Sequence, residues 1–152
     1  MSLEHILKTE QLLPKHRKAI IHLILVSNHI MEKLTEELKV FDTSLQQFNV
    51  LRILRGQKGK PANLYTIQER MIHKMSNTTR LVDKLILKGY VKRAVCESNR
   101  RKVEILITDK GLDALKEMDK AIHACEKELT AQLNPQELEN LNNLLDKFLV
   151  TL

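Results

Sequence analysis

The sequence predicts a mainly helical fold with one small β-hairpin, in which a winged helix-turn-helix is flanked by further helices. Apolar residues recur at helical spacing along most of the chain, and the spacing changes to strict alternation in two short segments after Gly89. Only 3% of the 152 residues are aromatic and four are glycine, which disfavours a β-sandwich. We therefore expect a leading helical region (residues 1–40), a winged helix-turn-helix (41–107) and trailing helices (108–152).

The first long helix is expected over residues 14–39. Pro14 suits the first turn of a helix, where its missing N–H group is no loss. The apolar residues at helical spacing are Ile20, Leu23, Ile24, Ile30, Met31, Leu34 and Leu38. Ile21, Leu25 and Val26 widen this stripe beyond a single buried face. The helix is therefore expected to contact two neighbours.

The second helix is expected to begin at a capping box formed by Ser44 and Gln47, and to end near Gly56. A second capping-box pair, Thr66 and Glu69, predicts the start of a short third helix.

Ser76 is expected to cap the next helix, which runs to about Lys88 and ends at Gly89. A short helix, a tight turn and a helix with a polar leading end are the parts of a helix-turn-helix. The side chain of Thr78, near the start of the second helix, can either face outwards or pack inwards.

A hairpin is predicted next, with strands at residues 90–95 and 102–107. Val103, Ile105 and Ile107 alternate with other residues in the second strand. The connection, residues 96–101, is polar and contains Ser98 and Asn99, which favours a turn. A helix-turn-helix followed directly by a basic hairpin is a winged helix.

Two more helices complete the chain. Thr108 and Asp109 are expected to cap a long helix, and Asn134 and Pro135 to cap and begin the last one. In the last helix, apolar residues repeat at spacings of three and four: Leu138, Leu141, Leu145, Phe148 and Leu152. This seam is too short for a free-standing coiled coil, so we expect it to meet a second copy of the chain in a homodimer.

The positive charge is concentrated in the middle third of the chain. Residues 1–51 are balanced, residues 52–102 carry fourteen basic and three acidic side chains, and residues 103–152 have a net charge of −5. Such a patch is typical of proteins that bind a polyanion, because each Lys or Arg placed on a phosphate releases condensed counterions. Charge alone leaves open DNA, RNA, an acidic protein partner or an ordinary solvated surface.

Three segments resemble the multiple antibiotic resistance regulator (MarR) family: LQQFNVLRIL (45–54), SNTTRLVDKLILKGYVKR (76–93) and NRRKVEILITDKG (99–111). The resemblance covers nearly the whole chain. It implies a dimer that binds palindromic double-stranded DNA, usually as a repressor and often relieved by a small molecule or an oxidant. One position departs from the family, which commonly has an acidic residue before the wing arginines, where this chain has Asn99; Glu97 is a candidate substitute.

The residues expected to bind DNA come from two elements. The helix-turn-helix provides Lys74, Ser76, Asn77, Thr79, Arg80 and Lys84. The leading end of such a helix reaches base edges in the major groove, where Asn can pair with adenine and Arg with guanine. Arg100 and Arg101 at the hairpin tip suit a narrow minor groove, and one of them can instead brace the loop. Lys92, Arg93 and Lys102 are expected to meet phosphates.

The sequence also offers candidate sensing residues. Cys96 beside the wing and Cys125 on the long helix are each either structural or redox-active. His22 and His29 lie seven residues apart and share a helix face, but without a further ligand we expect no metal site. The family resemblance implies an effector pocket near the dimer helices, for which Asn28, His29 and Met31 are candidate lining residues.

Several classes of protein are disfavoured. No glycine-rich phosphate loop, nucleophile elbow or HExxH motif is present, so we expect neither an enzyme nor a cofactor. No apolar run is long enough to span a membrane, no signal peptide is evident and the chain has two cysteines, so a cytoplasmic location is expected. The main alternative to a DNA-binding regulator is a dimeric adaptor whose winged helix binds an acidic protein; a redox- or metal-responsive regulator is a further variant.

Overall fold

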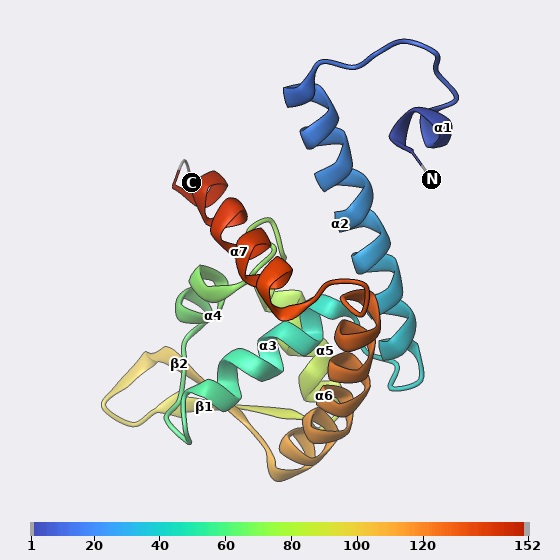
Figure 1. Cartoon of the computed structure of the whole chain (residues 1–152). Coiled ribbons are helices and arrows are strands. Elements are labelled where there is room, and N and C mark those ends of the chain that lie inside the picture. Colours follow the sequence, from blue (N-terminus) through green and yellow to red (C-terminus); the bar gives the residue numbers. More distant parts are fainter. Residues whose placement is uncertain (1, 151–152) are drawn as a thin grey trace.

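The computed structural model describes residues 2–150, and within them seven helices and two strands follow one another (Figure 1). Their bounds are α1 (Leu3–Leu7), α2 (Lys15–Lys39), α3 (Leu45–Gly56), α4 (Leu64–Arg70), α5 (Thr78–Leu87), β1 (Val91–Cys96), β2 (Asn99–Ile107), α6 (Asp109–Leu129) and α7 (Pro135–Leu149). The helical class, the hairpin and the order of the elements agree with the sequence prediction.

The short helix α1 was not expected. It begins after Ser2, whose hydroxyl accepts from the backbone N–H of His5. Lys18 on α2 donates to the Glu4 carboxylate at 2.7 Å, and this contact holds the pKa of that carboxyl below its usual value. A single turn of this kind has almost no periodicity, so the sequence pattern could not indicate it.

The core of the winged helix lies between α3, α4, α5, the hairpin and α6. The side chains that are fully enclosed include Leu51 of α3, Ile67 of α4, Leu85 of α5, Ile105 of β2 and Leu115 of α6. Leu38 at the end of α2 joins the same cluster. Helix α5 and the hairpin are therefore attached to a rigid body that also includes the end of the long leading helix.

Two predicted caps are wrong and three are confirmed. The capping box at Ser44 and the caps at Thr108 and Asn134 are present as predicted. Helix α4 is capped by Asn63, whose side chain accepts from Thr66 N–H at 2.7 Å, and not by Thr66. Helix α5 is capped by Asn77 instead of Ser76, because Ser76 is still part of the preceding turn, with its N–H bonded to the His73 carbonyl.

The hairpin is longer and its turn tighter than predicted. The strands pair antiparallel from Val91–Ile107 outwards, with a register shift beyond Val95. Only residues 97–98 form the turn, so the stretch 99–101 belongs to β2 and not to the loop. At the base of the hairpin, Ile105 exchanges two backbone hydrogen bonds with Ala62, of 2.8 and 3.0 Å, which tie the α3–α4 loop to the wing.

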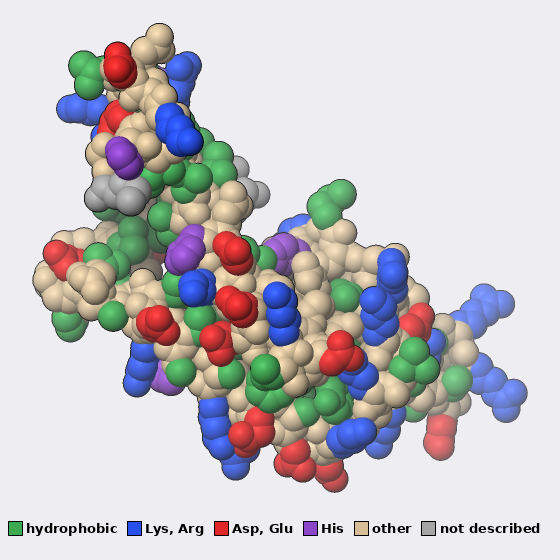
Figure 2. Space-filling view, turned by 90° about the vertical axis from the view of Figure 1, so that its right-hand side faces the viewer, with side chains coloured by type: hydrophobic (Ala, Val, Ile, Leu, Met, Phe, Trp, Pro, Cys, Tyr) green, Lys and Arg blue, Asp and Glu red, His purple; other side chains and the backbone are tan. Residues whose placement is uncertain are grey.

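The N-terminal half of α2 and the whole of α7 project away from this body (Figure 1). Helix α7 buries none of its residues, and Leu141, Leu144, Phe148 and Leu149 are each at least 40% exposed. Ile20, Ile24 and Val26 on α2 are about half exposed as well. Figure 2 shows hydrophobic side chains at the surface of this projecting part. Leu152, the last member of the predicted seam, lies outside the described residues.

No helix within residues 2–150 combines the length and the apolar character needed to cross a membrane.

Candidate nucleic-acid interface

The interface is built around the leading end of α5. Asn77 caps the helix, with its Oδ1 accepting from Arg80 N–H at 3.1 Å. Its amide N–H₂ group stays at the surface because the residue is exposed. The cap thus uses the acceptor of Asn77 and leaves its donor for a phosphate or a base edge.

Thr78, the first residue of α5, faces inwards. It is 6% exposed, and its hydroxyl donates to the side-chain carbonyl of Gln68 on α4. This bond joins the two helices of the helix-turn-helix. The inward alternative for Thr78 is therefore confirmed.

The exposed face of α5 carries the side chains that the sequence singled out. Thr79, Arg80 and Lys84 are all exposed, and within residues 2–150 neither cation forms an ion pair. Arg80 and Lys84 stand one turn apart and therefore on the same side. They border an open depression of about 460 Å³ whose other lining residues are Gln46, His73, Met75, Ser76, Asn77 and Leu81.

The turn before α5 adds two predicted residues and one that was missed. Lys74 is exposed, and its ammonium donates to the Glu69 carbonyl. The Ser76 hydroxyl is buried and lacks a hydrogen-bond partner within the described residues. Met75 is 99% exposed at the edge of the depression. A fully exposed methionine has no packing role, and because its exposure depends on the turn geometry the sequence carried no signal for it.

The wing presents Arg100 and Arg101 at the start of β2, next to the turn. Both side chains are exposed, and consecutive residues of a strand point to opposite faces. Asn99, which replaces the acidic residue usual in the family, accepts from the backbone N–H of Arg101 at 3.1 Å. Asn99 therefore fixes the backbone of an arginine but supplies no charge.

Some of the positive charges in the basic segment, residues 52–102, are paired with carboxylates within the protein. Arg93 on β1 pairs with Asp83 on α5 at 2.9 Å, and Arg55 on α3 pairs with Asp119 on α6. Arg93 thus links the wing to α5 through one exposed ion pair, and its guanidinium keeps further N–H donors. Its phosphate contact therefore stays a prediction. Sequence alone could not pair these residues, because they are ten and sixty-four positions apart.

A second, smaller cavity lies between the winged helix and the long helices. Its volume is about 130 Å³, and its lining residues are Met31, Leu34, Leu45, Phe48, Asn49, Arg52, Ile72, His73, Ile122 and Glu126. The Arg52 guanidinium lies 5.5 Å from the centre of the Phe48 ring. Of the three residues proposed for an effector pocket, Met31 lines this cavity, whereas Asn28 and His29 are exposed on α2.

The two cysteines differ in environment. Burial raises the pKa of the Cys125 thiol, and the nearby Glu37 carboxylate adds to the effect. Cys96 is half-buried with its Sγ 3.0 Å from the Ser98 hydroxyl. Across residues 2–150, no three His, Cys, Asp or Glu side chains are grouped so that they could hold a metal ion.

Comparison with known proteins agrees with this geometry. Residues 43–103, which span α3 to the middle of β2, match the model of the MarR family. This segment is a MarR-family domain. It contains α5, the second helix of the helix-turn-helix and from here on the recognition helix, together with the wing arginines. The MarR-family match therefore falls on the elements that form the candidate interface.

The relatives are transcriptional regulators. The chain is 31% identical over 96 residues to the HTH-type transcriptional regulator YfiV of Bacillus subtilis, covering 63% of this chain and 59% of that protein. It is 26% identical over 125 residues to the transcriptional repressor MprA of Escherichia coli, covering 80% and 71%. A cysteine-to-serine variant of E. coli MarR in complex with operator DNA shares the fold with a TM-score of 0.75 and 25% identity, over 98% of this chain and 99% of that one.

Proposed function

We propose that the protein is a dimeric, sequence-specific transcriptional regulator that binds a palindromic double-stranded DNA operator. We infer that it represses transcription and that it acts in the cytoplasm. The observation that carries this proposal is that Arg80 and Lys84 on α5 and Arg100 and Arg101 on the wing are all exposed, and that none of the four forms an ion pair within residues 2–150. Likeness to regulators and to a MarR–operator complex supports it.

In the proposed complex, Asn77, Thr79, Arg80 and Lys84 enter the major groove, and Lys74 and Ser76 approach the backbone at the helix start. Ser76 is assigned to this edge because it lines the depression next to Asn77 and Arg80. One of the two wing arginines enters the minor groove, since both cannot point to the same side of the strand.

The test is selection of duplexes from a randomised pool by the purified protein. The expected product is a palindrome with half-sites about one helical turn apart. Arg80→Ala should then lose affinity for that duplex by about a factor of ten. Lys116→Met, on α6, is the control. If no sequence is enriched, or if Arg80→Ala retains full preference, DNA recognition by α5 is refuted.

We also propose that the projecting parts of α2 and α7 form the homodimer interface, together with the end of α6. Both helices expose apolar side chains that are stabilised when another apolar surface excludes water from them. A partner related by a two-fold axis presents the same apolar surface in return. Leu144→Asp is expected to halve the mass measured by light scattering at micromolar concentration. Glu139→Ala on the same helix is the control, and an unchanged mass for Leu144→Asp would exclude α7 from the interface.

For the effector, we propose a small molecule in the 130 Å³ cavity, with Met31 in its wall; Asn28 and His29, exposed on the same helix, are not among its lining residues. A cavity of about 150 Å³ accommodates one benzene ring. Arg52 and Glu126 both line it, and an anionic substituent is expected to meet Arg52. Benzoate is therefore a suitable probe: it should raise the unfolding temperature and weaken binding to the selected duplex, and both effects should be lost in Met31→Trp. Absence of both effects in the wild type would exclude ring-sized acids.

A further inference from the structure

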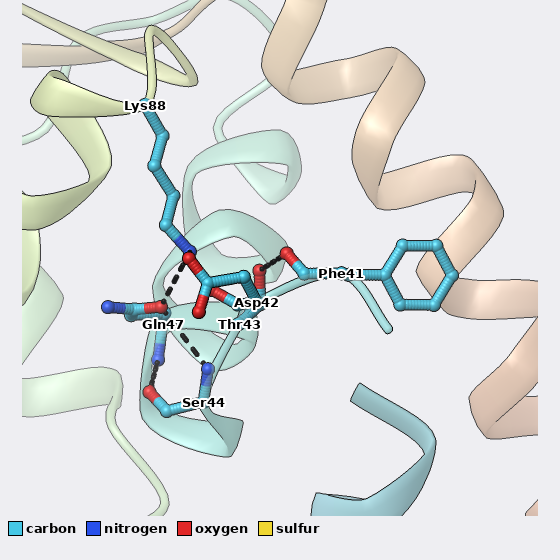
Figure 3. Close-up of polar contacts among 6 residues, drawn as sticks. All are labelled: Phe41, Asp42, Thr43, Ser44, Gln47 and Lys88. Atoms are coloured by element: carbon cyan, nitrogen blue, oxygen red, sulfur yellow. Dashed lines mark hydrogen bonds and ion pairs between the residues drawn. The ribbon is translucent and has the colours of Figure 1, made fainter. Parts of the chain in front are cut away.

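Lys88 lies at the trailing end of the recognition helix and reaches away from it to the turn between α2 and α3 (Figure 3). Its ammonium donates to the backbone carbonyl of Asp42. The same nitrogen is 3.5 Å from Oε1 of Gln47 and 3.7 Å from the Asp42 carboxylate. The Lys88 side chain is 22% exposed, whereas the Asp42 side chain is fully exposed, so the carbonyl and the amide oxygen are its sheltered partners.

The turn that receives Lys88 has an unusual backbone. Asp42 has φ +48°, in the left-handed region that favours glycine. Its own N–H donates to the Lys39 carbonyl at 2.9 Å, and Thr43 N–H donates to the Leu38 carbonyl at 3.3 Å. The left-handed residue closes the end of α2 and presents a carbonyl to the ammonium of Lys88. That bond helps to hold a conformation that a non-glycine residue rarely adopts.

Gln47 connects the same point to the start of α3. Its side chain is 6% exposed, and Oε1 accepts from Ser44 N–H at 3.2 Å as one half of the capping box. Figure 3 shows Lys88 and the capping box directed at the same oxygen. The end of α2, the first turn of α3 and the end of α5 therefore meet around one ammonium group.

We propose that Lys88 is a positioning residue for DNA recognition, which holds α5 in a fixed orientation to α2 and α3 without binding DNA itself. The inference rests on the proposed reading of DNA by α5. Lys88 is ten residues beyond Thr78, so it lies about 15 Å from the DNA-reading end of the helix. Its ammonium is occupied by acceptors on the α2–α3 turn and the first turn of α3.

The test compares Lys88→Met, which keeps the alkyl stem, with Lys88→Arg, which restores a donor and the charge. Binding is measured against the duplex selected by the wild type and against a scrambled duplex at several salt concentrations. Lys88→Met should lose about tenfold in affinity for the selected duplex, change little on the scrambled one and keep the wild-type salt slope. Lys88→Arg should recover most of the loss. Lys116→Met, which removes one exposed charge from α6, is the control.

Two results would overturn the proposal. One is wild-type binding by Lys88→Met. The other is an equal loss on both duplexes with the salt slope reduced by about 0.9, the mark of a lost phosphate contact. If Lys88→Met does not fold cooperatively, Lys88→Gln replaces it with the same expected loss, because its side chain is too short to reach Asp42. If the wild type enriches no duplex, the proposed function and this inference both fail. If the wild type enriches a duplex and Lys88→Met binds it equally well, only the inference fails.

Discussion

Gly111 is the position where the structure leaves no space for a side chain. It lies in the first turn of α6, and its N–H donates to the Thr108 hydroxyl at 3.0 Å. A Cβ added there would be 2.2 Å from the carbonyl oxygen of Tyr90 and 2.9 Å from Cγ1 of Ile107. Gly111→Ala therefore forces the base of the wing away from α6, since the first obstacle is backbone and not a flexible side chain.

The cost follows from three contributions. Pushing a backbone carbonyl aside by about 1 Å is an overpacking change that costs about 1–3 kcal/mol. The same carbonyl accepts from Thr108 N–H at 3.0 Å, and weakening that bond costs up to about 1 kcal/mol. Alanine regains about 1 kcal/mol over glycine as a helical residue. The expected net loss is about 2 kcal/mol, or a fall in unfolding temperature of about 4–8 °C for a chain of this size.

The assay is thermal unfolding followed by circular dichroism, at one protein concentration because the stability of a dimer depends on it. Gly56→Ala is the matched control: no atom lies within 4 Å of its added Cβ, and it ends α3 without a left-handed backbone. That variant should be unchanged or more stable by up to about 1 kcal/mol. If Gly111→Ala is as stable as Gly56→Ala, the close approach of the Tyr90 backbone to α6 is refuted.

Two further predictions concern the thiols and the wing. Because burial raises the pKa of Cys125, a thiol reagent at neutral pH should modify Cys96 first, and the rate at Cys125 should rise with pH beyond the range of an ordinary thiol; equal rates measured by mass spectrometry would contradict this. Asp83→Ala removes the exposed pair with Arg93, so the free energy of unfolding should change by less than about 1 kcal/mol. The preference for the selected over the scrambled duplex should nevertheless fall, and an unchanged ratio would show that the pair does not orient the wing.

The sequence predicted the elements well because their periodicity follows directly from burial. Alternation in 102–107 places Ile105 in the core, and helical spacing places Leu85 and Leu115 there, so any competing arrangement would expose them. Gly89 was predicted to end α5 and does so with φ +75°, a conformation that glycine adopts at little cost. Such features depend on residues close together in the chain.

The misses have a different origin. Between residues 63 and 77, several Asn, Thr and Ser side chains are able to cap a helix, and the sequence motif does not say which backbone is extended one residue before the first turn. Asn63 has that extended backbone, whereas Asn77 caps α5 with φ −82° and ψ 88°. The partners of Arg93 and Lys88 were missed because both contacts are long-range and depend on how the hairpin and the α2–α3 turn pack. Those contacts change which cations remain for DNA.

Helix α7 has a consequence for how the protein responds to its own abundance. It has fifteen residues, a Pro135 start and a capping box, yet none of its side chains is buried against the rest of the chain. A helix of this length is marginal in water when isolated, so the order of α7 has to come from contact with another surface. If a second copy provides that surface, dilution unfolds the helix as it separates the chains. The cost of ordering α7 then weakens association, so half-occupancy of the operator requires a higher copy number than a rigid dimer with the same contacts would need.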